Sequence, residues 1–147
     1  MTHPHVEQAL EPLLAPLLDL PDAVLLWGPV LTVQDAVQAM AFKHDRQFVP
    51  TVLEDLSPAL LKGLDASARG ILLVTNIAAL GETQNDAKYT SVARQLFLDR
   101  RVGDHAVPAG WCVWAAASKR GREVASPLTN RFLHIDLDDA IEQAQGT

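Results

Sequence analysis

A short turn after an apolar run is the part of this sequence best placed to do chemistry. Ala23-Val-Leu-Leu-Trp27 ends at Gly28-Pro29, and a helical pattern that contains Thr32, Gln34 and Asp35 follows. A strand, a glycine turn and a helix form a common phosphate site, because backbone N–H groups of the loop and the helix start point toward the anion. The residue types at this turn therefore decide whether a phosphate can bind.

Those residue types argue against a nucleoside triphosphate. A phosphate-binding loop needs glycines for its open backbone, a lysine for charge and a hydroxyl for Mg²⁺. Val33 is β-branched and resists the positive φ that glycine accepts, and Gln34 supplies no charge. Asp35, which we place in the first helical turn, gains about 0.3–1 kcal/mol from the helix dipole, but its carboxylate would repel a triphosphate. The alternative interpretation is that this segment is an ordinary turn between a strand and a helix. It too would not bind ATP.

Two further apolar runs end in polar residues. Gly70-Ile-Leu-Leu-Val74 is followed by Thr75 and Asn76, and the run from Trp111 is followed by Ser118. Neither Thr75 nor Asn76 offers a carboxylate to hold Mg²⁺ or to activate water. We expect no phosphoryl transfer from this set of residues.

In order and spacing, these segments resemble MoxR-type AAA+ ATPases. Leu25 to Asp35 resembles the family's Walker A segment, where Gly-Pro-Pro-Gly-Thr-Gly-Lys-Ser/Thr is expected. Gly28, Pro29 and Thr32 match it, whereas Leu31, Val33, Gln34 and Asp35 replace two glycines, the lysine and the Mg²⁺-binding hydroxyl. Gly70 to Asn76 resembles Walker B, with Thr75 and Asn76 in place of an Asp-Glu pair.

The resemblance extends over roughly residues 20–137. Leu96 to Trp111 is similar to the family's segment before the next strand, and Val113 to Ser118 resembles the sensor-1 strand, with Ser118 where Asn is usual. Ser126 to Phe132 resembles the arginine-finger segment and keeps Arg131. The resemblance implies that Arg131 reaches a neighbouring subunit's nucleotide site. The residues alone allow an ordinary surface arginine that pairs with Asp136 or a carbonyl.

Alternating strands and helices must position these residues. The pattern predicts a three-layer α/β fold, like that of a P-loop NTPase and the AAA+ core, with a five-stranded, mostly parallel sheet. The expected strands are Ala23–Trp27, Gln47–Leu53, Gly70–Val74, Trp111–Ala116 and Phe132–Leu137. We expect the first of these between the last two, and the strand near Phe48 at the edge because it contains Pro50.

The expected helices complete one domain over residues 1–147. They are Val6–Leu20 (broken or kinked by Pro12 and Pro16), a helix capped by Thr32 that ends near Phe42, a short helix or turn at Leu56–Leu64, Thr83–Arg100, and one from Asp138. Residues 1–20 form an N-terminal helical segment, 21–137 the α/β core and 138–147 a C-terminal helix. The family's helical lid is expected to be absent.

A few single residues have structural expectations of their own. Gly103-Asp104 is expected to form a hairpin-like turn. Trp111 and Trp114 lie three apart on one strand and should point to opposite faces of the sheet. Cys112 is expected to be a buried, inert thiol.

Composition narrows the class of partner. The net charge of −6 argues against nucleic acid, and the longest mainly apolar run, Ile71–Leu80, is too short to span a bilayer. With no signal-peptide pattern at the N-terminus, we expect a cytoplasmic protein that does not engage a membrane. Charge is uneven: residues 1–60 hold eight acids and two Lys/Arg, whereas residues 88–131 hold eight Lys/Arg and three acids.

These expectations favour a non-catalytic pseudo-ATPase. It would act as an accessory or regulatory subunit that docks on an active AAA+ ATPase, on that enzyme's client machinery, or on copies of itself. The alternative is a stand-alone binder of a nucleotide or other small ligand in a reshaped pocket. An enzyme with new chemistry is the third option, although no activated nucleophile stands out. No cofactor is expected, and no histidine spacing suggests a metal site.

Overall fold

Five parallel strands form the centre of the computed structural model, which describes residues 4–20, 22–78, 86–118 and 131–145. They are β1 (Val24–Trp27), β2 (Gln47–Thr51), β3 (Gly70–Val74), β6 (Trp111–Ala117) and β7 (Leu133–Asp136). Their order in the sheet is β2-β3-β6-β1-β7, and every neighbouring pair is parallel. The predicted α/β class, the inner position of β1 and the edge position of β2 are confirmed.

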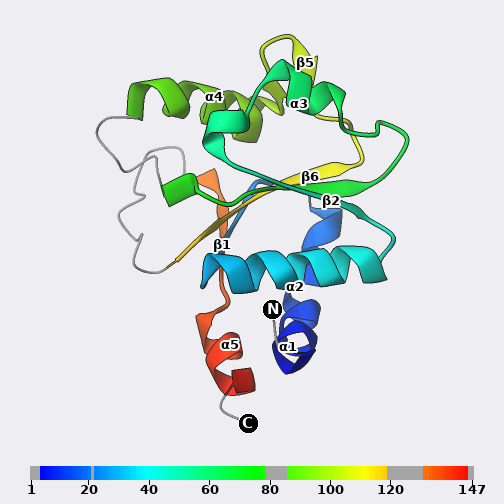
Figure 1. The fold of residues 1–147 in the computed structure, drawn as a ribbon, viewed down its shortest axis with the longest axis vertical. Helices are drawn as coiled ribbons and strands as arrows, with labels where there is room; N and C mark the ends of the chain where they lie inside the picture. The colour runs from blue at the N-terminus through cyan, green and yellow to red at the C-terminus, as the bar shows by residue number, and fades with distance from the viewer. Residues whose placement is uncertain (1–3, 21, 79–85, 119–130, 146–147) are drawn as a thin grey trace.

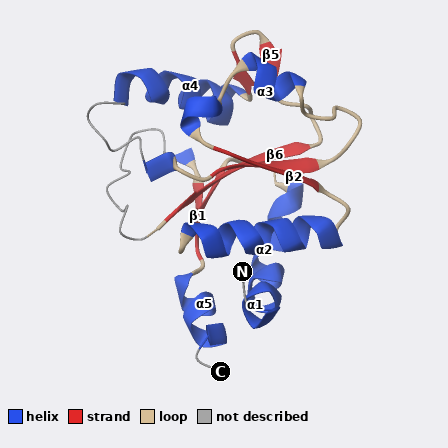
Figure 2. Cartoon of the chain, viewed as in Figure 1, coloured by secondary structure: helices blue, strands red, loops and turns tan. Residues whose placement is uncertain are grey.

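Helices cover both faces of this sheet (Figure 2). One side carries α1 (Pro4–Leu14), α2 (Val30–Lys43) and α5 (Asp138–Gln145). The other carries α3 (Pro58–Lys62), α4 (Asp86–Asp99) and a small hairpin of β4 (Arg101–Val102) and β5 (His105–Ala106) (Figure 1). Because both faces are covered, the inner strands are apolar throughout, and all five residues of β3 are buried.

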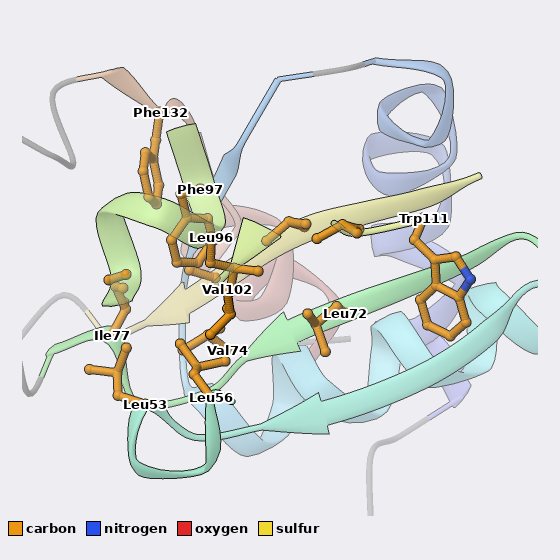
Figure 3. Close-up of a cluster of buried hydrophobic side chains, with 14 of the residues drawn as sticks. Leu53, Leu56, Leu72, Val74, Ile77, Leu96, Phe97, Val102, Trp111 and Phe132 are labelled. Carbon is orange, nitrogen blue, oxygen red and sulfur yellow. The ribbon is translucent and has the colours of Figure 1, made fainter. Parts of the chain in front are cut away.

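The two tryptophans of β6 show how the sheet divides the core. Trp111 is buried among the residues under α3 and α4, and Trp114 among those under α1 and α2. The prediction that they face opposite sides is confirmed. Among the buried residues under α3 and α4, Phe97 of α4 lies against Phe132 with ring centroids 4.7 Å apart. This pair is at the far end of that group from Trp111 (Figure 3).

The N-terminal helix is interrupted as its two prolines predict. α1 contains Pro12 and ends at Leu14, after which Ala15–Asp19 forms a 3₁₀ helix, η1. Val6, Leu10 and Leu14 are fully buried. Helix α1 contacts both α2 and α5, so these three helices form one layer.

The start of α2 differs from the sequence prediction. Thr32 does not cap this helix, because Pro29 occupies the cap position and the helix begins at Val30. Asp35 consequently lies in the second turn and not in the first, which contains no acidic residue. A helix that starts earlier shortens the turn after β1 to Gly28 and Pro29.

Smaller differences occur elsewhere. β2 ends at Thr51, and Leu53–Asp55 is a 3₁₀ helix, η2, instead of a continuation of the strand. α3 begins after Ser57, whose Oγ accepts a hydrogen bond from the Leu60 N–H at 3.2 Å. Gly103 adopts a φ of +58° in the β4–β5 turn, which confirms the predicted hairpin.

Two findings concern the predicted environment of the chain. None of the helices in the described residues combines the length and the apolarity that a membrane crossing requires. Cys112 is half-buried and not buried as predicted. Its Sγ donates to the Leu18 carbonyl at 3.4 Å, and burial raises the pKa of the thiol, which disfavours the reactive thiolate.

Gly70 provides a test of how tightly this core is packed. A Cβ at Gly70 would come within 2.7 Å of the Trp111 ring, and Trp111 is held by a 2.9 Å hydrogen bond from its Nε1 to the Asp65 carbonyl. We expect Gly70→Ala to lower the free energy of unfolding by about 1–3 kcal/mol in urea denaturation. Gly63→Ala is the matched control, because Gly63 has a φ of −75° and only ordinary contacts. Equal stability of the two variants would contradict this packing.

Candidate functional site

The strand register brings most of the predicted site residues to one edge of the sheet. Trp27 lies level with Ala117, and Val74 with Ala115. Gly28, Thr75 and Ser118 come directly after these strands, so they gather at the carboxyl edge of a parallel sheet. Ligands bind at this edge in open α/β sheets, and the predicted location of the site is where such a fold would place it.

The turn between β1 and α2 is short and hydrogen-bonded. The Gly28 N–H donates to the Ala117 carbonyl at 2.9 Å, which ties the turn to β6. The Val33 N–H donates to the Pro29 carbonyl at 2.9 Å, a bond within the first turn of α2. In the Gly-x-x-x-x-Gly-Lys pattern, the residues between the glycines form the loop around the phosphates. Here residues 30–32 between these positions, and Val33 at the second glycine position, belong to the helix instead.

Apolar side chains fill the space above Gly28. A Cβ at this position would lie 3.1 Å from Val33 Cγ2 and 3.3 Å from Ile141 Cδ1. Val33 is fully buried and Ile141 is 2% exposed. Helix α5 therefore packs over the turn together with α2.

Thr75 and Asn76 fasten β3 to the segment after β2. Both the backbone N–H and the hydroxyl of Thr75 donate to the Thr51 carbonyl, at 2.9 and 3.2 Å. Asn76 Oδ1 accepts from the Leu53 N–H at 2.8 Å, and its Nδ2 donates to both carboxylate oxygens of Glu54, at 3.0 and 3.2 Å. The Thr75 side chain thus ties β3 to the end of β2, and the Asn76 side chain holds η2 in place.

The remaining predicted site residues of α2 and β6 are partly accessible. Thr32, Gln34 and Asp35 are half-buried in α2, and Ser118 is half-buried where the description of β6 ends. Pro29 is exposed at the cap of the helix, and Gly28 is buried. Residues 119–130, which include most of the segment that resembles an arginine finger, lie outside the described part of the chain.

Arg131 lies at the opposite edge of the sheet from the turn. It is exposed and precedes β7, whose first residue Leu133 pairs with Val24 at the start of β1. The four residues of β1 span about 13 Å at 3.3 Å each, and that length separates Arg131 from Gly28. Arg131 is therefore placed to act outside its own turn and not within it.

The described charged residues that follow the strands at the carboxyl edge are acidic. Glu54 and Asp55 follow β2, and Asp136, Asp138 and Asp139 end β7 or open α5. Among the described residues that directly follow the five strands (28–31, 52–57, 75–78, 118 and 137–140), none is Lys or Arg.

Two interactions near the sheet edges were not foreseen from the sequence. Trp27 Nε1 donates to His134 Nδ1 at 3.0 Å, which links the end of β1 to β7. Arg100 has a φ of +54°, and its guanidinium donates to the Trp111 carbonyl at 2.6 Å, so this residue holds the hairpin to β6 and is not a free surface charge. Neither contact has a local sequence signal. Trp27 and His134 lie far apart in the chain, and Arg100 bonds to a backbone carbonyl, which every residue has.

The described residues contain no group of three or more His, Cys, Asp or Glu side chains that could hold a metal ion. Asn76 and Glu54 are paired with each other, and Asp136 Oδ1 accepts from the Asp138 N–H at 3.0 Å at the start of α5. The polar groups of this edge therefore contribute to internal hydrogen bonds.

Comparison with solved structures defines the class of fold. Three mutant forms of RuvB from Thermotoga maritima superpose on this chain with TM-scores of 0.56–0.59 at 18–20% identity. The match covers 90–94% of this chain and 44–46% of each RuvB chain, so the chain spans less than half of their length. RuvB is an AAA+ ATPase, and the fold is that of its P-loop NTPase-like core. No protein-family model matches the sequence, and no curated protein matches it.

Asn76 gives a direct test of the hydrogen bonds at this edge. We expect Asn76→Ala to lower the free energy of unfolding by about 1–2 kcal/mol, because the buried Leu53 N–H loses its acceptor. Asn76→Asp keeps that acceptor but sets a carboxylate against Glu54. Its deficit should be present at neutral pH and shrink on acidification, because repulsion raises the folded-state pKa of the introduced carboxyl.

The control combines Asn76→Asp with Glu54→Gln. The new amide can donate to the introduced carboxylate, so urea denaturation should show recovery of most of the lost stability. A double variant as unstable as Asn76→Asp alone would show that Glu54 is not the partner.

Proposed function

We propose that this chain is a catalytically degenerate AAA+ core of the MoxR type that acts as an accessory or regulatory subunit of an active AAA+ ATPase. The observation that carries the proposal is the β1–α2 turn. Helical residues replace the loop that would surround the phosphates, and Val33 with Ile141 fills the space above Gly28. A fold that keeps the architecture of an ATPase but replaces its phosphate loop with the first turn of a helix is suited to a structural role.

The Walker B positions support the same conclusion. Thr75 donates to the end of β2 and Asn76 holds η2, and neither side chain carries a carboxylate. Phosphoryl transfer depends on positioned charge around the phosphates and Mg²⁺. With Gln34 at the lysine position and acids along this edge, the proposed protein is not an enzyme and uses no nucleotide cofactor.

The position of Arg131 favours an ATPase as the partner. Because it lies at the edge opposite its own turn, it can meet the carboxyl edge of an adjacent domain in a head-to-tail arrangement. An active partner would then gain an arginine at its nucleotide site and receive no working site in return. The net charge of −6 favours a protein over nucleic acid as the partner. We place this interaction in the cytoplasm.

Calorimetry with ATP and Mg²⁺ tests the first half of the proposal. We expect no binding tighter than about 1 mM, which corresponds to about −4 kcal/mol. A micromolar dissociation constant would overturn the proposal and favour a ligand-binding protein instead. A panel of other nucleotides run in parallel separates a reshaped pocket from a closed one.

Turnover of an AAA+ ATPase encoded beside this gene tests the second half. The chain should bind that enzyme at low salt and change its ATPase rate, and Arg131→Ala should abolish the change while leaving binding measurable. Arg69→Ala is the matched control, because Arg69 is also exposed and precedes a strand at the same edge. If Arg131→Ala and the wild type change turnover equally, the finger role is wrong. Absence of binding at low salt removes the docking proposal.

A further inference from the structure

The outer face of α2 carries the two most exposed large apolar side chains of the described residues. Leu31 is 76% exposed and Phe42 is 85% exposed, whereas the next, Leu13, is 42% exposed. The helix buries its opposite face, which includes Val33, Val37 and Met40, against the sheet and α1. Two large side chains left in water on one helix mark a surface that a partner can cover.

These two residues lie on one stripe of the helix. They are eleven residues apart, which is about three turns and about 16 Å along the axis. Asp35 and Gln38 lie between them on the same stripe, at spacings of four and three residues. Along the helix axis, the side chains of this stripe are therefore apolar, polar, polar and apolar in order.

This order is the same in both directions, so the stripe can be complementary to a second copy of itself. When a second copy of α2 lies antiparallel on the first, Leu31 faces Phe42 of the second copy, and Asp35 faces Gln38 of the second copy. An isologous two-fold contact requires this kind of self-complementary surface. We propose that the outer face of α2 forms an antiparallel contact with a second copy of this chain, centred between Asp35 and Gln38.

The chemistry of each facing pair suits this arrangement. The Leu31 and Phe42 side chains remove each other from water at both ends of the contact. In the middle, the Gln38 amide can donate to the Asp35 carboxylate, which has lone pairs for more than one hydrogen bond and keeps its partner within the chain. A groove of about 170 Å³ between α1 and α2, lined in part by Ala39 and Lys43, lies beside this stripe.

The contact is small, and this sets its strength. Stable interfaces bury about 1,600 Å² in total, more than one pair of helices provides. The dimer should therefore be weak and concentration-dependent. It does not use Arg131 or the β1–α2 turn, so it stands or fails independently of the ATPase proposal, and a dimer would deliver two copies of Arg131 to one assembly.

Sedimentation over a concentration series tests the interface. The wild-type chain should pass from monomer to dimer, and Leu31→Glu or Phe42→Glu should raise the dissociation constant about tenfold or more, because one large apolar anchor is lost from each end of the contact. Both side chains are exposed, so these variants should fold normally. Leu13→Glu, which alters an exposed leucine of α1, is the matched control and should leave dimerisation unchanged. A wild-type chain that stays monomeric throughout overturns the proposal.

Disulfide formation tests the orientation. In a Cys112→Ala background, Leu31→Cys and Phe42→Cys proteins mixed under oxidising conditions should form the mixed dimer, and each alone should not. Antiparallel packing brings only unlike positions within the roughly 7 Å between Cα atoms that a disulfide allows. If each variant links to itself instead, the helices are parallel and the proposed contact is wrong.

Discussion

The packing of Val33 and Ile141 over Gly28 is the constraint on which the rest of the structure depends. It joins β1, the first turn of α2 and the start of α5 at one point, while the Gly28 N–H ties the same turn to β6. Helix α1 then packs against both α2 and α5 and completes that layer. Opening a loop at this turn would expose the buried side chains of Val33 and Ile141, at a cost of about 1.5–3 kcal/mol for each. The closed turn is thus maintained by the core itself.

An α/β fold of this class does not need its nucleotide chemistry to be stable. Its stability comes from burying both faces of β3, β6 and β1, and these strands are apolar whatever follows them. The residues at the strand ends are then available for other purposes. Asn76 shows this, because the position where the resemblance expects a catalytic acid now holds the backbone of Leu53 and the carboxylate of Glu54.

The sequence predicted most of the sheet, because apolar runs and chain breakers are local signals. Pro50 placed β2 at the edge, and the spacing of Trp111 and Trp114 predicted a core on each face. The start of α2 was missed because Thr32 resembles a cap, whereas Pro29 already has a φ suited to the helix start. The Asn76 contacts to Leu53 and Glu54 span more than twenty residues, and no local pattern encodes them. The edge position of Arg131 follows only from the register of β7 with β1.

Amide hydrogen exchange across residues 28–33, measured by NMR with and without Mg²⁺ and ATP, tests the central claim most directly. If the turn is closed, the Gly28 and Val33 amides, bonded to Ala117 and Pro29, are protected, and ATP changes neither their exchange nor their chemical shifts. Rapid exchange at both amides, with protection that appears only when ATP is added, would show an open phosphate loop and would contradict the account.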